Sequence, residues 1–319
     1  MKDPRVIFAG TPEFARASLS ALVDAGVVPV AVLTQPDRPA GRGKRVTPSP
    51  VKRYAEEHDI PVMQPPTLRD DDVVAQLLAL EPDIMVVAAY GLILPQTVLD
   101  IPARGCLNVH ASVLPRWRGA APIQAAILAG DKTTGVSLMS MTAGLDCGPV
   151  YVAAPLAIAP GETAGALHDR LATLGGDTLA QYLDDILERR ITPVPQDESA
   201  TTYAGKINKS DAQLDWSQSA VDLERRVRAY DPVPGAFFFA SLRGGSDVAE
   251  PLRIKCWRAA SVADIDATPG TVVSSGADGI DVACASGALR LLELQLPGKR
   301  RVKAGEFAHQ IDLTDRILS

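Results

Sequence analysis

Short apolar runs alternate with helical patterns through the first half of the chain, and this alternation limits the possible folds most strongly. The apolar runs are RVIFAG, VVPVAVLT, DIMVVAAYG, LNVHA and GVSLMSM, which are typical of strands covered on both faces. Between them, apolar residues recur at helical spacing in EFARASLSALVDAG and DDVVAQLLALEP. This order predicts right-handed βαβ units and a doubly wound, mostly parallel α/β sheet.

The pattern changes after a long helical stretch that ends near residue 189. Residues 190–208 are rich in Pro, Ser, Thr and Asp without a sustained period, which is typical of a linker. Residues 209–319 contain one helical pattern and then several short strand-like runs separated by Gly-containing turns. We therefore predict an α/β domain at residues 1–189, a linker, and a small β-barrel or sandwich at residues 209–319.

Length and composition indicate the cellular setting. The chain has 319 residues, of which 46% are hydrophobic and 22% charged, as in a soluble protein large enough for two domains. Its longest apolar run, Ile84 to Leu94, is shorter than the roughly 20 residues that cross a bilayer, and the N-terminus lacks a signal-peptide pattern. The four cysteines are widely separated, which favours neither disulfides nor a zinc site. We expect a cytoplasmic protein without a membrane partner.

Two polar residues, Asn108 and His110, stand at the end of an apolar strand-like run. Because side chains alternate along a strand, both point to the same face, where buried polar groups cost free energy unless something compensates them. The carboxyl ends of strands are where open α/β sheets bind ligands, so the pair is a candidate oxyanion clamp. Asp146, in a tight loop flanked by Gly144 and Gly148, is placed to reach His110 and orient its imidazole.

The distribution of charge is uneven. A net charge of -6 argues against a nucleic-acid partner, since phosphate binding favours a basic surface. One early stretch nevertheless sets six cations against Asp37 alone: Arg38, Arg42, Lys44, Arg45, Lys52 and Arg53. A long loop beside the active edge of such a sheet favours phosphate binding over a purely solvated role. Gly10 and Thr11 lack the full G-x-G-x-x-G pattern around them, so nicotinamide binding is only weakly supported.

Four segments together closely resemble bacterial methionyl-tRNA formyltransferases: LNVHASVLPRWRGAAPIQ, GLDCGPV, FAGTPEFA and TQPDRPAGRGKRVTPSPVK. The resemblance is nearly continuous through the N-terminal two-thirds and looser through LDWSQSA and ELQLPGKR. It implies a Rossmann-like formyltransferase fold followed by an OB-like β-barrel that contacts tRNA. It also implies formyl transfer from 10-formyltetrahydrofolate to the amine of methionyl initiator tRNA for translation initiation, by a monomeric enzyme without a metal.

The resemblance also assigns residues. Asn108 and protonated His110 would stabilise the oxyanion of a tetrahedral intermediate, and Asp146 would orient His110 and help relay a proton. The folate co-substrate would bind along a loop in which Val113 replaces the commoner Leu: Ser112, Val113, Leu114 and Pro115.

For tRNA, the resemblance implies that Arg42 lies in a loop that wedges into the acceptor end, where a weak first base pair costs little to open. The implied tRNA contacts of that loop are Arg42, Lys44 and Arg45. Further candidates for phosphate contacts are Lys206, Lys209, Arg300, Arg301 and Lys303.

Other functions fit part of this pattern. A 10-formyltetrahydrofolate hydrolase, or a formyltransferase acting on a sugar or nucleotide amine, would retain Asn108, His110 and Asp146, and the hydrolase would leave the basic loop and C-terminal domain without a role. A non-catalytic RNA-binding protein would leave the polar triad without a purpose. A nicotinamide oxidoreductase fits the sheet but not the motifs.

Overall fold

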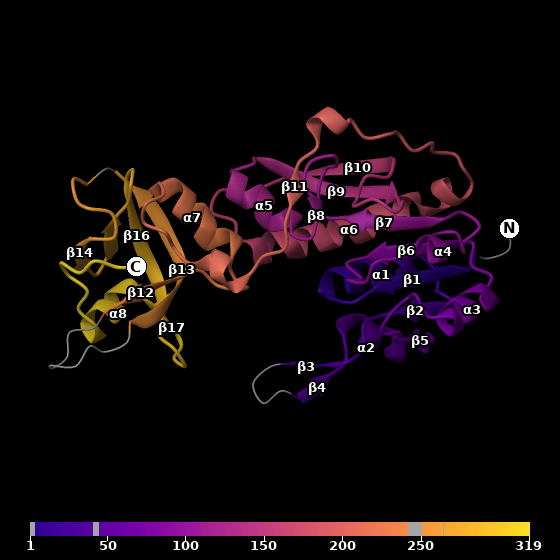
Figure 1. Ribbon diagram of the computed structural model, residues 1–319, viewed down its shortest axis with the longest axis horizontal. Coiled ribbons are helices and arrows are strands. Elements are labelled where there is room, and N and C mark those ends of the chain that lie inside the picture. Colours follow the sequence, from indigo (N-terminus) through magenta and orange to yellow (C-terminus); the bar gives the residue numbers. More distant parts are fainter. Residues whose placement is uncertain (1–3, 41–44, 242–250, 264) are drawn as a thin grey trace. The chain divides into compact units, whose positions relative to one another are not determined.

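The computed structural model describes residues 4–40, 45–241, 251–263 and 265–319. The chain forms two compact units (Figure 1). Unit 1 comprises Met1–Pro122, Thr133–Ala157 and His168–Gly205, and unit 2 comprises Ile123–Lys132, Ile158–Leu167 and Lys206–Ser319. The two units therefore interleave along the chain. The division at residues 189 and 208 that the composition favours stays a prediction.

Unit 1 is built on a seven-stranded sheet in the order β10-β9-β7-β6-β1-β2-β5, which runs from top to bottom in Figure 1. The five strands from β5 to β7 are parallel, whereas β9 and β10 extend the sheet in antiparallel fashion. This arrangement confirms the predicted mostly parallel sheet. The strands are β1 (Val6–Gly10), β2 (Ala31–Leu33), β5 (Val62–Met63), β6 (Ile84–Ala88), β7 (Cys106–His110), β9 (Thr133–Ser140) and β10 (Val150–Ala157).

The strand order reverses at β1. The chain passes from β1 through β2 to β5 on one side and then returns to place β6 and β7 on the other side. Side chains link the segments that leave the carboxyl ends of these strands: Thr11 Oγ1 donates to the Tyr90 carbonyl over 2.9 Å, and Gln35 Nε2 donates to the same oxygen over 3.2 Å. Such a switch point is where doubly wound sheets bind ligands.

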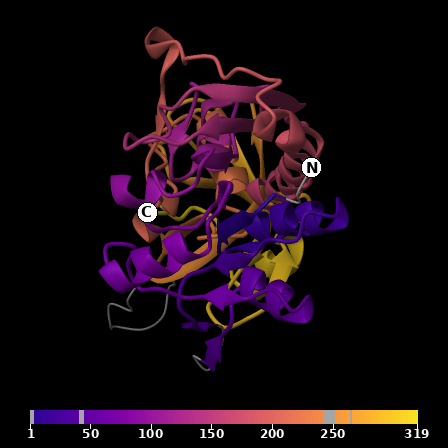
Figure 2. The ribbon, with the colours of Figure 1, turned by 90° about the vertical axis from the view of Figure 1, so that its right-hand side faces the viewer.

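Helices cover both faces of this sheet. On one face α1 (Glu13–Asp24) and α6 (Ala164–Leu187) pack closely, since a Cβ on Gly176 would lie 3.0 Å from the Ala17 carbonyl oxygen (Figure 2). Gly175 of α6 faces Val109 of β7. On the other face α3 (Asp71–Ala79) and α4 (Gln96–Leu99) contribute to a core with Ile7, Met85 and Cys106. Because Asn108 and His110 alternate with Val109, they point away from α6.

The basic stretch forms regular structure instead of one long loop. Arg38–Ala40 (β3) and Arg45–Thr47 (β4) pair as an antiparallel hairpin, and α2 (Pro50–Glu57) begins directly after it. The loop prediction was therefore wrong for Lys52 and Arg53, which are helical. The Ser-Pro pair explains the helix start, because Ser49 accepts the Lys52 N–H over 3.0 Å and Pro50 fits the first turn. Arg42 and Lys44 lie outside the described residues, as does the side chain of Arg45.

Unit 2 contains the antiparallel sheet predicted for the C-terminal part. Its strands follow the order β12-β13-β16-β15-β14, and β17 pairs with β16. A hydrophobic core that includes Trp216, Phe238 and Phe307 joins the sheet to the helices beside it. This curved antiparallel sheet is consistent with the predicted OB-like domain. The strands are β12 (Phe237–Ala240), β13 (Leu252–Val262), β14 (Val272–Gly276), β15 (Gly279–Ala283), β16 (Ala288–Gln295) and β17 (Arg301–Lys303).

The remaining elements are short or connect the two units along the chain. Helix α5 (Pro122–Ala129) lies between β8 (Arg118–Gly119) and β9, and unit 2 also contains α7 (Ala220–Ala229) and α8 (Ala304–Gln310). Residues 190–208 contain the 3-10 helix η1 (Glu198–Ala200) and β11 (Tyr203–Ala204), and η2 (Lys209–Ala212) follows. Across the parts of the chain that the structure describes, no helix combines the length and the apolar character that crossing a bilayer requires.

Candidate active site

Strand β7 carries Asn108 and His110 to the carboxyl edge of the sheet. Both side chains are largely buried, with 8% of Asn108 and 6% of His110 exposed. The strand pairs in parallel with β6 and antiparallel with β9, where His110 lies opposite Ser137. The backbone of Asn108 is therefore paired on both sides, opposite Val87 of β6 and Met139 of β9, and His110 ends the strand beside β9.

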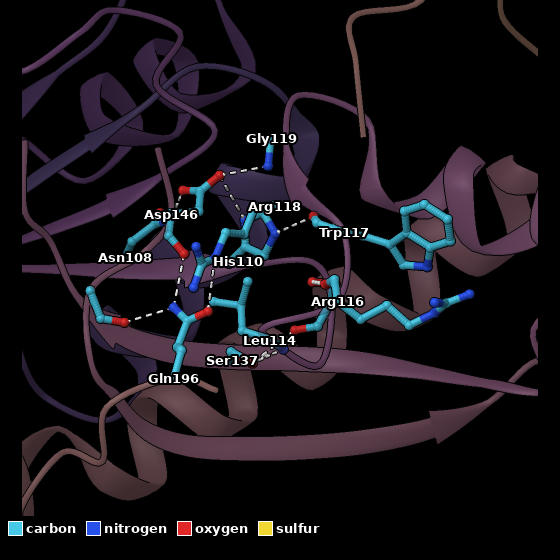
Figure 3. Close-up of polar contacts among 12 residues, drawn as sticks. Asn108, His110, Leu114, Arg116, Trp117, Arg118, Gly119, Ser137, Asp146 and Gln196 are labelled. Carbon is cyan, nitrogen blue, oxygen red and sulfur yellow. Dashed lines mark hydrogen bonds and ion pairs between the residues drawn. The ribbon is translucent and has the colours of Figure 1, made fainter. Parts of the chain in front are cut away.

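Asp146 lies in the loop between β9 and β10, and its carboxylate faces the polar pair (Figure 3). Oδ1 accepts a hydrogen bond from Asn108 Nδ2 over 3.4 Å, and Oδ2 lies 3.7 Å from His110 Nδ1. Oδ2 also accepts the backbone N–H of Gly119 over 2.8 Å, the shortest of these contacts. The three residues that the sequence predicts as catalytic are thus brought together around one carboxylate.

The backbone of the Asp146 loop is unusual. Asp146 has a φ of 48°, in the left-handed region that few non-glycine residues adopt. Two residues later the chain passes so close to β9 that a Cβ on Gly148 would lie 1.8 Å from the Ser140 carbonyl oxygen. Glycine is required there, and the close approach sets the distance between the loop and the sheet.

The other ring nitrogen of His110 also has a partner. Nε2 lies 3.0 Å from the Trp117 carbonyl oxygen, and because a carbonyl can only accept, Nε2 carries the proton. Trp117 is itself held, since its backbone N–H donates to Thr202 Oγ1 over 2.9 Å. The imidazole is therefore oriented from both sides, with Asp146 facing Nδ1 and a fixed carbonyl facing Nε2.

A second group of residues supports this site: Gln196 and Glu198, which were not predicted from the sequence, and Arg118, whose role the sequence leaves open. Arg118 is 2% exposed, and it forms two hydrogen bonds with the Glu198 carboxylate, of 3.0 and 2.8 Å, and one of 3.0 Å with Gln196 Oε1. The Glu198 carboxylate raises the pKa of Arg118, and Arg118 lowers the pKa of Glu198. Gln196 Nε2 donates to the carbonyls of Asp146 and Gly148 over 2.8 and 2.7 Å.

Gln196 and Glu198 belong to the segment that the composition identifies as a linker. Part of this segment pairs with the active-site loop, because β11 runs parallel to β8 and Ala204 lies opposite Gly119. Isolated side-chain contacts of this kind leave no periodic signal, so the sequence pattern contains nothing that would have revealed them.

The predicted folate loop follows β7 directly and is anchored to β9. Ser112 is fully buried, and its hydroxyl donates to the Arg116 carbonyl over 2.6 Å. Ser137 Oγ donates to the Ser112 carbonyl over 2.8 Å and accepts the Leu114 N–H over 3.1 Å. These bonds fix the backbone of Ser112 and Leu114, while Val113 and Pro115 remain half-buried.

Arg116 and Trp117 stack beside this loop. The guanidinium of Arg116 lies 4.3 Å from the centre of the Trp117 ring, and both side chains extend away from Asn108 and Asp146 in Figure 3. A cation over an aromatic face is a favourable contact.

The C-terminal cations that we consider for tRNA contacts differ in their surroundings. Lys206, Lys209 and Lys303 are exposed. Arg300 pairs with Glu306 over 2.6 Å, and Arg301 pairs with Asp231 over 3.1 Å while covering the Trp257 ring at 3.6 Å.

Comparison with known families and structures agrees with the fold. Residues 4–183 match the formyl transferase family, and residues 206–311 match the formyl transferase C-terminal domain. Among solved structures, an N-formyltransferase from Helicobacter canadensis in complex with folinic acid and dTDP-3-aminofucose superposes with a TM-score of 0.65 at 16% identity, over 90% of this chain and 98% of that chain. HypX from Aquifex aeolicus in complex with tetrahydrofolic acid gives 0.59 at 16% identity, over 97% of this chain and 47% of that chain.

Curated relatives are much more similar in sequence. The chain is 53% identical to the methionyl-tRNA formyltransferase of Nitrosococcus oceani, over 99% of this chain and 95% of that protein. It is 51% identical to the methionyl-tRNA formyltransferase of Methylococcus capsulatus, over 98% of this chain and 99% of that protein. These matches confirm the resemblance that the four sequence segments indicate. The chain belongs to the methionyl-tRNA formyltransferase family.

Proposed function

We propose that Asn108, His110 and Asp146 form the centre at which this formyltransferase moves the formyl group of 10-formyltetrahydrofolate to the α-amine of methionyl initiator tRNA. The products are N-formylmethionyl-tRNA and tetrahydrofolate. The observation that carries this proposal is the placement of all three side chains around one carboxylate at the carboxyl edge of β7, with Asp146 Oδ2 held by Gly119 at 2.8 Å.

The reaction needs a group that stabilises developing negative charge. The neutral amine attacks the formyl carbon and gives a tetrahedral intermediate with an oxyanion; the amine then loses a proton, and N10 leaves after gaining one. The amide N–H of Asn108 is suited to donate to that oxyanion. Its contact with Asp146 is long, at 3.4 Å, so turning toward the substrate sacrifices only a weak hydrogen bond.

His110 and Asp146 act as a pair. In the geometry described above, Nε2–H of His110 points at the Trp117 carbonyl, and the carboxylate lies beside Nδ1. If a substrate oxygen replaced the Trp117 carbonyl as acceptor, it would accept a hydrogen bond from Nε2–H of His110, whose ring is already oriented. Asp146 balances the positive imidazolium and provides an acceptor close to the proton released by the amine.

The folate co-substrate would bind along Ser112, Val113, Leu114 and Pro115. The Ser137 hydrogen bonds support this assignment, because they fix the backbone of a loop that begins two residues after His110. Val113 and Pro115 offer apolar surface to a flat ring system. The Helicobacter canadensis and Aquifex aeolicus structures contain folinic acid and tetrahydrofolic acid, respectively, in the same fold.

The tRNA would be engaged through the segment that contains Arg42, Lys44 and Arg45. The base of this segment is tied to the body of unit 1, since Lys52 Nζ contacts Asp37 Oδ2 over 2.7 Å and Gln64 Oε1 over 2.9 Å. A fixed base would hold cations where the acceptor end must enter, and a local basic segment allows an acidic chain to bind RNA. We further propose that the enzyme acts in the cytoplasm as a monomer.

The decisive experiment follows a radiolabelled formyl group from 10-formyltetrahydrofolate. We expect transfer to methionyl initiator tRNA, much less to methionyl elongator tRNA, and little free formate. Equal formylation of both tRNAs would contradict the assignment of the initiator as substrate. Formate release without formylated tRNA would indicate a hydrolase, and preferential formylation of a dTDP-amino sugar would indicate a sugar formyltransferase.

A further inference from the structure

We propose that Gln196 is a positioning residue for catalysis, which fixes the Asp146 carboxylate by holding the backbone of its loop. The inference rests on the proposed role of Asp146. It assigns a function in the reaction to a segment whose composition is that of a linker.

The side-chain amide of Gln196 joins two loops (Figure 3). Its Nε2 donates to the carbonyls of Asp146 and Gly148, over 2.8 and 2.7 Å, and its Oε1 accepts from Arg118 Nε over 3.0 Å. Because carbonyls only accept and a guanidinium only donates, the amide has one possible orientation. All three contacts require an amide of this length, so neither glutamate nor methionine can reproduce them.

Arg118 gives the amide a fixed reference point. Its guanidinium is buried and held by both carboxylate oxygens of Glu198, and its neighbour Gly119 donates the N–H that fixes Asp146 Oδ2. Gln196 therefore connects the loop that carries the Asp146 carboxylate to the loop that carries the donor to it. A shift of one loop relative to the other would change the Gly119 contact and the 3.7 Å separation from His110 together.

The backbone of Asp146 explains why such a support is needed. A non-glycine residue at a φ of 48° is held there only when its surroundings impose that conformation. Gln196 binds the carbonyls of residues 146 and 148 and so restrains the chain on both sides of Cys147. Displacements of about 1 Å in a catalytic group can reduce turnover by about 100-fold.

Two substitutions at Gln196 test this role. Gln196→Glu retains the acceptor for Arg118 but turns an oxygen toward the carbonyls of Asp146 and Gly148, whereas Gln196→Met removes all three bonds. We expect each to lower kcat by about 10- to 100-fold, with KM for folate and for tRNA changed by less than about twofold. Gln181→Glu, an exposed position on α6 with the same change of charge, serves as control and retains wild-type kcat.

A double-mutant cycle separates positioning from general stabilisation. If Gln196 acts through Asp146, Gln196→Glu in an Asp146→Asn background lowers the residual kcat by less than about twofold, because the effects are not independent. If Gln196→Glu lowered kcat in the Asp146→Asn background by the same factor as in the wild-type protein, the proposal would be overturned. Wild-type kcat for both Gln196 variants, or an increase in KM alone, would also overturn it.

The same cycle distinguishes this inference from the proposed function. Wild-type kcat in Asp146→Asn alone would show that Asp146 has no catalytic role, and the proposed active centre would fail along with its support. A defective Asp146→Asn together with fully active Gln196 variants would overturn only the role of Gln196. Circular dichroism and thermal unfolding of each variant identify any that fails to fold, in which case the other Gln196 variant decides.

Discussion

Gly119 donates its backbone N–H to Oδ2 of Asp146 over 2.8 Å, so a residue without a side chain holds the carboxylate that faces His110. Gly119 has a φ of 117°, and a Cβ there would lie 2.5 Å from the Ala204 carbonyl oxygen. The short β8–β11 pair and the Asp146 contact thus depend on the same glycine.

We expect Gly119→Ala to lower kcat by about 10- to 100-fold, because the added methyl separates β11 from β8 and moves the N–H away from Asp146. Steady-state formylation kinetics and thermal unfolding measure the effect. Gly205→Ala is the matched control, since a Cβ at that position meets no atom within 4 Å. Equal kcat for the two variants would contradict the importance of the Gly119 contact.

Asn108→Ala removes the proposed oxyanion donor while leaving strand β7 intact. We expect kcat to fall by about 10²- to 10³-fold, equivalent to about 3 to 4 kcal/mol of transition-state stabilisation. Folate affinity, measured by calorimetry, should persist because the hydrogen bonds that fix the proposed folate loop come from Ser137 and not from Asn108. A kcat close to that of the wild type would remove Asn108 from the mechanism.

Arg42→Ala tests the proposed tRNA contact. We expect weaker formylation of methionyl initiator tRNA, with a higher KM for tRNA and an unchanged KM for the folate. The dependence of tRNA binding on salt concentration should also decrease, because one fewer cation of the protein would release counterions from the tRNA phosphates. Arg69→Ala, at an exposed position between β5 and α3, serves as control. Indistinguishable kinetics at low and moderate salt would exclude the wedge role.

Asp281 supports unit 2 in a pH-dependent manner. Its buried carboxylate accepts two hydrogen bonds from Arg290, of 2.7 and 2.8 Å, and one from Ser274 of 3.0 Å. The Arg290 guanidinium holds the pKa of Asp281 below its ordinary value. Because the folded pKa is lowered, the stabilisation is complete above the unfolded pKa of about 3.9 and disappears as the pH falls through the folded pKa.

We therefore expect Asp281→Asn to lower the free energy of unfolding near pH 7 by about 1 to 2 kcal/mol, the lower part of the range for charged hydrogen bonds because Arg290 is partly exposed. The difference from wild type should shrink in the most acidic buffers that leave both proteins folded. Urea unfolding across this pH range measures it. A difference that stays constant down to the lowest pH would contradict the ionic origin of the stabilisation.

The cysteines should differ sharply in reactivity. Cys106, Cys256 and Cys284 are buried, and burial raises the pKa of the first two thiols to about 12 and that of Cys284 to about 11. Cys147, next to Asp146, is only half-buried. At about pH 8 we expect a disulfide reagent to label one thiol quickly in the native protein, and Cys147→Ser to abolish that labelling. Rapid labelling of a second thiol would indicate that a buried strand opens.

The central sheet and the polar triad were accessible from the sequence because both arise from local patterns. The alternation of strand and helix periods predicts the parallel order, and the two-residue spacing of Asn108 and His110 predicts their common face. The antiparallel strand β10 was not predicted. Its sequence, VYVAAPLA, is apolar throughout and so does not show the alternation of half-buried and exposed positions, and it contains Pro155, which argues against a strand except at the edge of a sheet, where β10 lies.

The hydrogen bonds that hold the loops of the active site could not be predicted in the same way. The sequence leaves the role of Arg118 open, and only folding across 80 positions brings it to Glu198. Likewise Gln196 meets the Asp146 carbonyl from 50 positions away. Composition describes such a segment by what it lacks, namely a period and apolar residues, and this description misses single side chains that bind backbone atoms elsewhere.

The pairing of β8 with β11 determines where the chain can be cut for functional dissection. A fragment that stops at residue 189 would retain Asn108, His110 and Asp146 but lose Gln196, Glu198 and Thr202. A fragment that extends to residue 205 would keep all six side chains, together with the Ala204 backbone that receives the Ala120 N–H. The smallest stretch of chain that encodes a fully supported active centre therefore ends inside the apparent connector, at Ala204, which is 17 residues beyond Leu187, the last residue of the long helix α6.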